Sequence, residues 1–559
     1  MSRTERHRLI ASGLLTAVLI YVYPLFAATP LLEPDEGLHA TISQEMLEHG
    51  EWVVPRFRGE PFPDKPILYF WAQMLSLKAF GMNELAVRLP GLMFGLLGSL
   101  ATGLLAGRLF DSQTGLLACL ISMSMFLPLS LAQAAAHDVA LVPWTSLALL
   151  CLWEMERSSV RRRQRTWLAG AAVMFALAIL TKALIGVAII GIGYGGFLIL
   201  SRQIRTGRCL RLFSVIVLGV LVASPWYLAM ELRVSGYLYY YFVERHLLGF
   251  VTATQPHGHE PWYYYGPWLV LGAVPWTWYL VPLLRDEWSA FRRRGSTEPE
   301  IMLLLCWLIG GIVFLSVAGS KLVTYSLPLF PACSILCAVC WRRYGSGRLS
   351  GTSAGWFRLM VRVAGGAGML VPAVVLGVCQ IHLRTTWPLT CWLLAAVVTV
   401  ISGVTWRTFE RRQINDTAAL VPLWVAGMAC LVITWPLQNF AEEFSERSLA
   451  DWVNRQPELP ERLLLVGERP ASVLFYLKPE LRRAMIPGQF SKVTIDELRN
   501  ARQLPDDLWL AVTDRMVREA AARQQSIPGT WTDSVGQFQI FCCEDQARQL
   551  SQMVWRSAR

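Results

Sequence analysis

Long apolar segments recur along most of this chain of 559 residues and stop near residue 436. Each is close to the roughly 20 mainly apolar residues that a helix needs to cross a bilayer. Thirteen of them are predicted as transmembrane helices, at residues 9–28, 86–107, 114–134, 139–156, 166–181, 184–201, 212–230, 267–284, 301–319, 322–341, 359–381, 387–406 and 417–436. The pattern therefore predicts a polytopic α-helical membrane domain over residues 1–436.

The polar connections between these segments predict which side each one faces. Alternate connections are rich in arginine and share one side with the N-terminus, at residues 157–165, 202–211, 285–294, 342–348 and 407–413. The positive-inside rule makes that side cytoplasmic. The long loops 29–85 and 231–266 and the residues after 436 then face the periplasm or the cell exterior.

Shorter patterns predict the elements outside the membrane. In "DEGLHATISQEMLEHG" Leu38, Ile42 and Met46 form an apolar stripe typical of a helix, and "PDKPILYFWAQMLSLKAFG" is apolar nearly all round, which favours a helix in or on the membrane. From Ala441 onward charges are frequent. There "RLLLVGE", "DLWLAV" and "QFQIFCC" are predicted as strands and "TIDELRNARQL" as a helix, so residues 437–559 are predicted as a small soluble α/β domain.

The composition supports a membrane protein and argues against a nucleic-acid partner. Of the residues, 54% are hydrophobic and 16% are charged, which is too apolar for an ordinary soluble enzyme. The net charge of +11 comes from arginines spread over the loops, so no nucleic-acid partner is expected. Most cysteines lie inside apolar runs and are predicted to pack there. A cleaved signal peptide is the alternative for the first segment, but no clear cleavage site follows it.

Candidate acids lie where predicted helices meet the outer surface. Glu33, Asp35 and Glu36 follow the first apolar segment in "LLEPDEGLHA", and Asp138 lies between two closely linked segments. Capping of a helix would explain an acid at either place. The other interpretation is chemistry, since a lipid-linked substrate presents its head group at this surface and isolated membrane carboxylates are usually paired or functional.

Candidate cations lie near the same surface. Lys65 opens the second loop helix, where its ammonium and the amide dipoles would converge on a phosphate, and Arg58 and Arg88 could add donors. Lys321 and Tyr325 are four residues apart and would share one face of a helix. Such residues also occur at interfaces simply to contact lipid phosphates, which stays an alternative.

A metal site is predicted from the second long loop. His257 and His259 place two imidazoles on one side of an extended chain, an arrangement that suits a divalent metal such as zinc. Glu260 follows them, and Asp64 of the other loop is a possible further ligand. Incidental use of the two histidines is the alternative. The chain has no Walker A or Rossmann motif, so no nucleotide cofactor is expected.

Five motifs carry a resemblance: "EPDE" at 33–36, "DKP" at 64–66, "VRLP" at 87–90, "HD" at 137–138 and "SKLVTYSLP" at 320–328. With the segment count and the outer terminal domain, they resemble the bacterial lipid A aminoarabinose transferases and the related protein O-mannosyltransferases. The resemblance implies the GT-C glycosyltransferase fold and a polyprenyl-phosphate sugar donor. It also implies that Asp35 is the principal catalytic carboxylate, with Asp138 as a second and Glu36 grouped with them, and that Lys65 and Tyr325 contact the carrier phosphate.

One residue departs from the pattern of that family. The family usually has Glu before the loop lysine, where this chain has Asp64.

The predicted function is transfer of a sugar, 4-amino-4-deoxy-L-arabinose, from undecaprenyl phosphate to a lipid A phosphate. The predicted place is the periplasmic face of the bacterial inner membrane, among membrane lipids. An enzyme of the same fold that glycosylates a protein or glycan hydroxyl is the near alternative. A transporter is the distant one, and it would need charges at mid-membrane.

Overall fold

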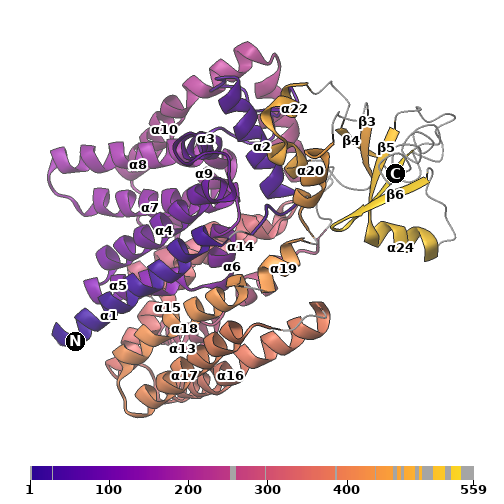
Figure 1. Ribbon diagram of the computed structural model, residues 1–559. Coiled ribbons are helices and arrows are strands. Elements are labelled where there is room, and N and C mark those ends of the chain that lie inside the picture. The colour runs from indigo at the N-terminus through magenta and orange to yellow at the C-terminus, as the bar shows by residue number, and fades with distance from the viewer. Residues whose placement is uncertain are drawn as a thin grey trace.

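The structure, a computed structural model, consists of a large body of helices with a small sheet domain at one side (Figure 1). It describes residues 3–27, 29–251, 260–295, 297–383, 387–434, 436–442, 444–456, 462–466, 471–484, 490–493, 508–522 and 530–542. In the view of Figure 1 the N-terminus and the sheet lie at opposite ends of the molecule.

Ten helices of the described chain are long and apolar enough to cross a membrane. They contain α1 (Arg3–Ala17, continued by helical turns to Phe26), α4 (Glu84–Leu109), α7 (Leu141–Arg157), α8 (Arg161–Lys182), α10 (Thr206–Arg233), α14 (Pro299–Val317), α15 (Phe330–Gly345), α16 (Gly351–Leu383), α17 (Leu389–Glu410) and α18 (Ile414–Thr434). Two bent pairs raise the number to twelve. The shorter apolar helix α9 (Leu184–Leu200) coincides with the remaining predicted segment, so each predicted segment is helical.

The two bent pairs meet at their breaks. One joins α5 (Ser112–Met123) to α6 (Phe126–Ala132) at 63°, and the other joins α12 (Tyr265–Gly272) to the helical segment that contains α13 (Leu280–Arg294) at 104°. The N–H of Phe126 donates to the Val274 carbonyl at 3.1 Å. An unpaired amide inside a membrane is costly, so each break is tolerated where the other supplies a partner.

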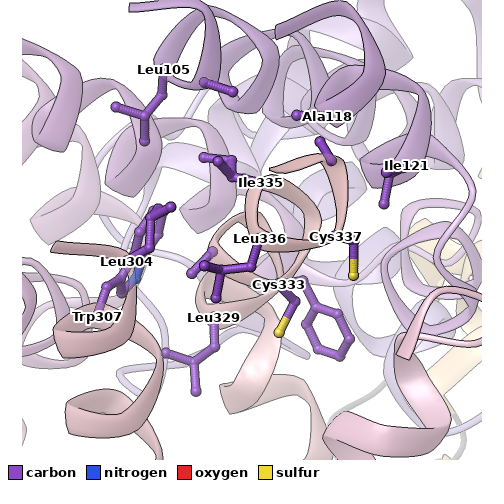
Figure 2. Close-up of a cluster of buried hydrophobic side chains, with 14 of the residues drawn as sticks. Leu105, Ala118, Ile121, Leu304, Trp307, Leu329, Cys333, Ile335, Leu336 and Cys337 are labelled. Atoms are coloured by element: carbon purple, nitrogen blue, oxygen red, sulfur yellow. The ribbon is translucent and has the colours of Figure 1, made fainter. Parts of the chain in front are cut away.

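The centre of the helical body is an apolar cluster around α15 (Figure 2). Leu304 and Trp307 of α14 approach it from one side, and Ala118 and Ile121 of α5 from another. The cysteines inside the apolar runs are free and buried, as predicted for packing residues: Cys119, Cys151, Cys306, Cys333, Cys337 and Cys340. Small side chains let helices approach closely in a membrane protein.

The first long loop forms two helices, as predicted. These are α2 (Asp35–Glu48) and α3 (Leu68–Phe80), joined through the hairpin of β1 (Arg56–Phe57) and β2 (Glu60–Pro61). The predicted stripe of Leu38, Ile42 and Met46 is buried in a shared cluster with α3 and α10. Helix α3 is covered by protein on one face, whereas its residues Leu75 and Phe80 are exposed. The second long loop holds a π-helix, Tyr239–Leu248, followed by α11 (Gly249–Val251).

The terminal domain is a mixed sheet with helices, which confirms the α/β prediction. Its helices are α19 (Pro436–Glu442), α20 (Arg447–Val453), α21 (Ala471–Tyr476), α22 (Pro479–Ala484) and α24 (Asp514–Ala522). The strands β3 (Arg462–Val466), β4 (Phe490–Val493), β5 (Leu508–Thr513), β6 (Thr530–Val535) and β7 (Phe538–Cys542) follow the order β4-β3-β5-β7-β6. The parallel pairs β3–β4 and β3–β5 adjoin the antiparallel pairs β5–β7 and β6–β7.

The three predicted strands correspond to β3, β5 and β7. The sequence reasoning missed the two edge strands β4 and β6, whose "FSKV" and "TWTDSV" lack a clear apolar alternation. Edge strands are often short and polar, because they need no buried second neighbour. The predicted helix "TIDELRNARQL" lies outside the described residues.

Candidate active site

Asp35 begins α2 without acting as its cap. The N-cap position is Pro34, and no side chain caps this end. The Asp35 carboxylate is exposed and has no hydrogen-bond or ion-pair partner among the described residues. The helix dipole still favours an acid here. The structure therefore leaves both oxygens of Asp35 open to solvent or substrate.

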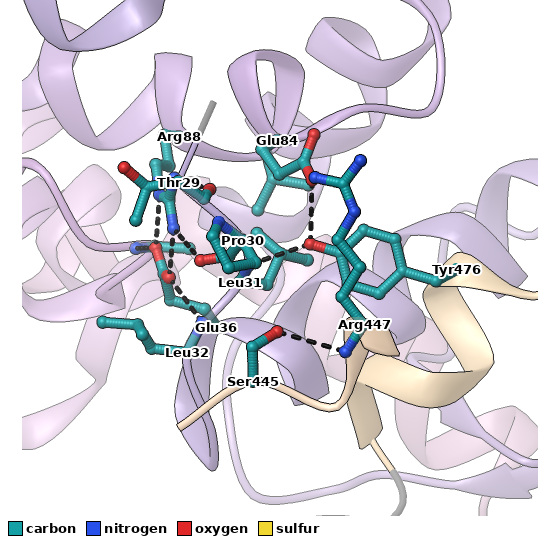
Figure 3. Close-up of polar contacts among 12 residues, drawn as sticks. Thr29, Pro30, Leu31, Leu32, Glu36, Glu84, Arg88, Ser445, Arg447 and Tyr476 are labelled. Carbon is teal, nitrogen blue, oxygen red and sulfur yellow. Dashed lines mark hydrogen bonds and ion pairs between the residues drawn. The ribbon is translucent and has the colours of Figure 1, made fainter. Parts of the chain in front are cut away.

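Glu36, the next residue, is buried, and both of its carboxylate oxygens accept hydrogen bonds (Figure 3). Its carboxylate accepts from Arg88 at 2.9 and 2.7 Å, and also from the backbone N–H groups of Leu32 and Ala135. The Arg88 guanidinium donates further to the carbonyls of Thr29 and Pro30. We call this set of bonds the Arg88 network. Glu36 and Arg88, both predicted site residues, therefore hold the loop that leads to Asp35.

Asp138 is paired rather than used as a helix cap. It forms an ion pair with Lys182, and both side chains are buried. Lys182 ends α8, and its Nζ lies 3.8 Å from the centroid of the Tyr325 ring. Sequence reasoning did not select Lys182, although a single cation at the end of an apolar segment was a usable signal.

Asp64 is held by two residues of the second long loop. Its Oδ1 accepts from the Tyr240 hydroxyl at 2.6 Å, and its Oδ2 lies 3.4 Å from the Arg245 guanidinium. Burial raises the pKa of Tyr240 to about 12, and the bond to Asp64 adds to this. Tyr240 and Arg245 were not among the predicted site residues.

These contacts do not fit the predicted metal site at Asp64. The carboxylate of Asp64 keeps lone pairs free beside these two contacts, but the Arg245 guanidinium already balances its charge and would repel a second cation. His257 and His259 lie outside the described residues. Among the residues that the structure describes, no group of three or more His, Cys, Asp or Glu could hold a metal.

Lys65 lies beside Asp64 at the approach to α3 and is partly buried. Within the described part of the chain its ammonium has neither an ion-pair nor a hydrogen-bond partner. Burial lowers the pKa of Lys65, while the nearby Asp35 carboxylate acts in the opposite direction. The Asp35 carboxylate also lies close enough to Lys182 and Tyr325 to interact with them electrostatically. We call Asp35, Lys65, Asp138, Lys182 and Tyr325 the Asp35 cluster.

Two other predicted site residues are used differently. Residues 321 and 322 are not helical, so Lys321 and Tyr325 do not share a helix face; the Lys321 ammonium donates to the carbonyls of Glu260 and Ala318 at 3.1 and 2.7 Å. Arg58 sits at the β1–β2 turn with φ 60°, and Glu45 accepts its backbone N–H at 2.7 Å. The Arg58 side chain is partly buried, and its predicted contact with substrate stays a prediction.

Three comparisons place this arrangement among known proteins. Residues 64–228 match the family model described as dolichyl-phosphate-mannose-protein mannosyltransferase. The chain is 29% identical over 393 residues to undecaprenyl phosphate-alpha-4-amino-4-deoxy-L-arabinose arabinosyl transferase 2 of Proteus mirabilis, with 69% of each chain covered. It is 32% identical over 325 residues to the corresponding transferase of Pectobacterium carotovorum, which covers 57% of this chain and 56% of that one.

A solved structure extends the likeness to nearly the whole chain. ArnT from Cupriavidus metallidurans, bound to undecaprenyl phosphate, superposes with a TM-score of 0.73 at 20% identity and covers 95% of this chain and 97% of that one. This chain therefore has the fold of ArnT and is similar in sequence to these transferases. The predicted GT-C membrane fold with a small terminal sheet domain is thereby confirmed.

A buried pair of histidines, His39 and His137, was not selected by the sequence reasoning. His39 lies one turn after Asp35, and its Nδ1 is 3.0 Å from the Ala135 carbonyl. Its ring centroid is 4.1 Å from that of His137. Burial lowers the pKa of His39 to about 4, so the ring is neutral at neutral pH. His39 therefore adds no positive charge to the Asp35 cluster.

Proposed function

We propose that this ArnT-like chain transfers 4-amino-4-deoxy-L-arabinose from undecaprenyl phosphate to a phosphate group of lipid A. The Proteus and Pectobacterium relatives carry that donor and sugar in their names. The Cupriavidus structure contains undecaprenyl phosphate. Since the alignments span 69% and 56% of the two relatives, the activity of the whole protein rests also on the site.

The observation that carries the proposal is the charge pairing around Asp35. Asp138 pairs with Lys182, and Asp64 pairs with Arg245. Within the Asp35 cluster, this leaves the Asp35 carboxylate and the Lys65 ammonium without an ion-pair partner in the described part of the chain. A sugar on a phosphate carrier offers one centre of developing positive charge and one anionic leaving group, and these two open groups match them in sign.

Lys65 and Tyr325 are assigned to the carrier phosphate. Lys65 is partly buried and its pKa is lowered, so a phosphate that restores its charged state gains a strong partner. The negative charge on the departing phosphate grows as the glycosidic bond breaks. Donors already in place at that oxygen stabilise the transition state more than the ground state.

Asp35 is assigned to the sugar and the acceptor. In the reaction the bond between C1 of the sugar and the carrier phosphate oxygen breaks, and a bond between C1 and a lipid A phosphate oxygen forms with inversion. The acceptor phosphate is already ionised at neutral pH, so no proton has to be removed. Asp35 then orients the acceptor or stabilises positive charge on the ring. A hydroxyl acceptor would instead need Asp35 as a general base.

The proposal places the reaction at the periplasmic face of the inner membrane. The arginine-rich connections share the side of the N-terminus, and the loop that bears Asp35 and Lys65 belongs to the opposite side. The carrier phosphate bond already holds the free energy of transfer, so the reaction needs no nucleotide there.

The test is an acceptor comparison with purified full-length protein. The protein is incubated with undecaprenyl-phosphate aminoarabinose and, in separate reactions, with lipid A, a pilin-like protein or a glycan, and each acceptor is weighed by mass spectrometry. The proposal predicts an increase of one aminoarabinose residue on lipid A alone. An increase only on the protein or glycan would replace it with the hydroxyl-acceptor alternative. No increase on any acceptor, with a donor shown to be active by another transferase, would contradict it.

A further inference from the structure

The backbone that leads to Asp35 is held from two sides. The Arg88 network fixes the carbonyls of Thr29 and Pro30 from the membrane domain. From the terminal domain, the Tyr476 hydroxyl accepts the N–H of Leu31 at 2.8 Å, and the Phe444 carbonyl accepts the N–H of Glu33 at 3.0 Å. Figure 3 shows Thr29 and Pro30 held by Arg88 of the membrane domain and the next residue, Leu31, held by Tyr476 of the terminal domain.

Helix α21 of the terminal domain packs directly on the first turns of α2. The N–H of Ser472 donates to the Glu33 side chain at 2.6 Å, and the Thr41 hydroxyl donates to the Ala471 carbonyl at 2.6 Å. Gly37 permits this approach, because a Cβ there would lie 2.7 Å from the Ser472 nitrogen. Phe475 of the same helix is buried with Leu31 in one apolar cluster.

Tyr476 is itself held in place. Its hydroxyl donates to Glu84 at 3.0 Å, and Arg447 binds the same carboxylate oxygen at 3.1 Å. The Arg447 guanidinium also lies 5.7 Å from the centroid of the Tyr476 ring. The hydroxyl that anchors Leu31 thus has a fixed orientation, set by one residue at the start of α4 and one of α20.

We infer that Tyr476, Ser472 and Phe444 of the terminal domain form a loop clamp that positions Asp35 for transfer. Asp35 has no side-chain bond of its own among the described residues, so its place depends on its backbone. Positioning matters because small displacements of a catalytic group can cost about a hundredfold in rate. The inference rests on the proposed function, and it makes the terminal domain part of the catalytic unit.

The test replaces Tyr476 by Phe in the full-length protein. Tyr476→Phe removes the acceptor of the Leu31 N–H and the donor to Glu84, but keeps Phe475, Thr41 and the Arg482–Glu48 ion pair at the domain contact. The matched control is Tyr194→Phe in α9, a buried hydroxyl with no hydrogen-bond partner in the described part of the chain. Two quantities are measured: hydrogen exchange of peptides that cover residues 31–36, and kcat with KM for the donor.

The clamp predicts that Tyr476→Phe speeds amide exchange of that segment and lowers kcat, each by about tenfold or more, because the hydrogen bonds of the hydroxyl to Leu31 and to Glu84 are both lost. KM for the donor stays within about twofold, because Lys65 and Tyr325 are untouched. Tyr194→Phe changes none of these quantities. A second pair separates positioning from general damage: Glu33→Gln keeps an acceptor for the Ser472 N–H and retains activity, whereas Glu33→Ala loses it.

Two results would overturn the inference. Unchanged exchange in Tyr476→Phe would show that the clamp does not hold the loop. Faster exchange with an unchanged kcat would show that the loop position does not limit transfer. If the wild-type protein transfers no sugar, the proposed function fails and the catalytic role of the clamp fails with it. The exchange rates still report separately whether the two domains hold the loop.

Discussion

Glu36 and Asp35 are adjacent carboxylates with opposite surroundings. Glu36 is buried and accepts from Arg88 and two backbone amides, whereas Asp35 is exposed and has no bonded partner in the described structure. Because α2 begins at Asp35, the two side chains leave the helix in different directions. The comparison teaches that the fully hydrogen-bonded carboxylate of Glu36 holds the site together, whereas the exposed carboxylate of Asp35 is free to contact substrate.

The largest expected effect comes from neutralising Glu36, the fully hydrogen-bonded carboxylate. Glu36→Gln removes the negative charge that faces the buried Arg88, and breaking a buried ion pair in this way costs about 3–5 kcal/mol. We expect a lower midpoint of thermal unfolding in detergent and faster amide exchange over residues 29–36. A variant as stable as wild type would show that the Arg88 network does not hold the loop.

A second variant compares the two ways in which the site treats a lysine. Lys182 is buried against Asp138 and Tyr325, so Lys182→Met leaves the Asp138 carboxylate without its cation. We expect a loss of transfer activity of about a hundredfold, in line with an uncompensated buried charge. Lys182→Arg keeps the charge and should recover part of the rate. Equal rates for the Met and Arg variants would mean that the charge of Lys182 plays no part.

Lys65, the open lysine, gives a pH-dependent effect. Its pKa is lowered by burial, so it loses its proton at a lower pH than an ordinary lysine. Since only the protonated form attracts the carrier phosphate, KM for the donor should rise as the pH increases through the lowered pKa. An arginine stays protonated over this range, so in Lys65→Arg the KM should stay flat with pH. The same alkaline rise in both proteins would remove Lys65 from phosphate binding.

The smallest expected effect is that of a chelator. Arg245 and Tyr240 already contact the two oxygens of Asp64, so removal of divalent metals should change the rate by less than about twofold. The measurement is the initial rate before and after dialysis against EDTA, with the metal content determined in the same samples. A larger loss that zinc restores would support the predicted site of Asp64, His257 and His259.

How much of this could be read from the sequence depends on the range of the contacts. Apolar length predicted all ten to twelve candidate spans of the described chain, because a span is set by bilayer thickness, but it also predicted a thirteenth at the shorter helix α9. The motifs selected Asp35, Lys65 and Asp138. The partners Lys182, Arg245 and Tyr476 could not be selected, because each reaches its acid across 44 or more residues of chain. The same limit explains why Glu36 and Asp35 looked alike: what separates them is Arg88, 52 residues away.

The most direct measurement is the mass of lipid A after incubation of donor with wild-type protein and, in parallel, with Asp35→Asn. The unfolding midpoint is recorded on the same preparations. Asn matches the shape of Asp and removes only its charge, and no bond of Asp35 is lost in the described structure. The account predicts an increase of one aminoarabinose residue with wild type, at least a hundredfold lower rate with the variant, and the same midpoint for both. Transfer by Asp35→Asn at the wild-type rate would contradict it.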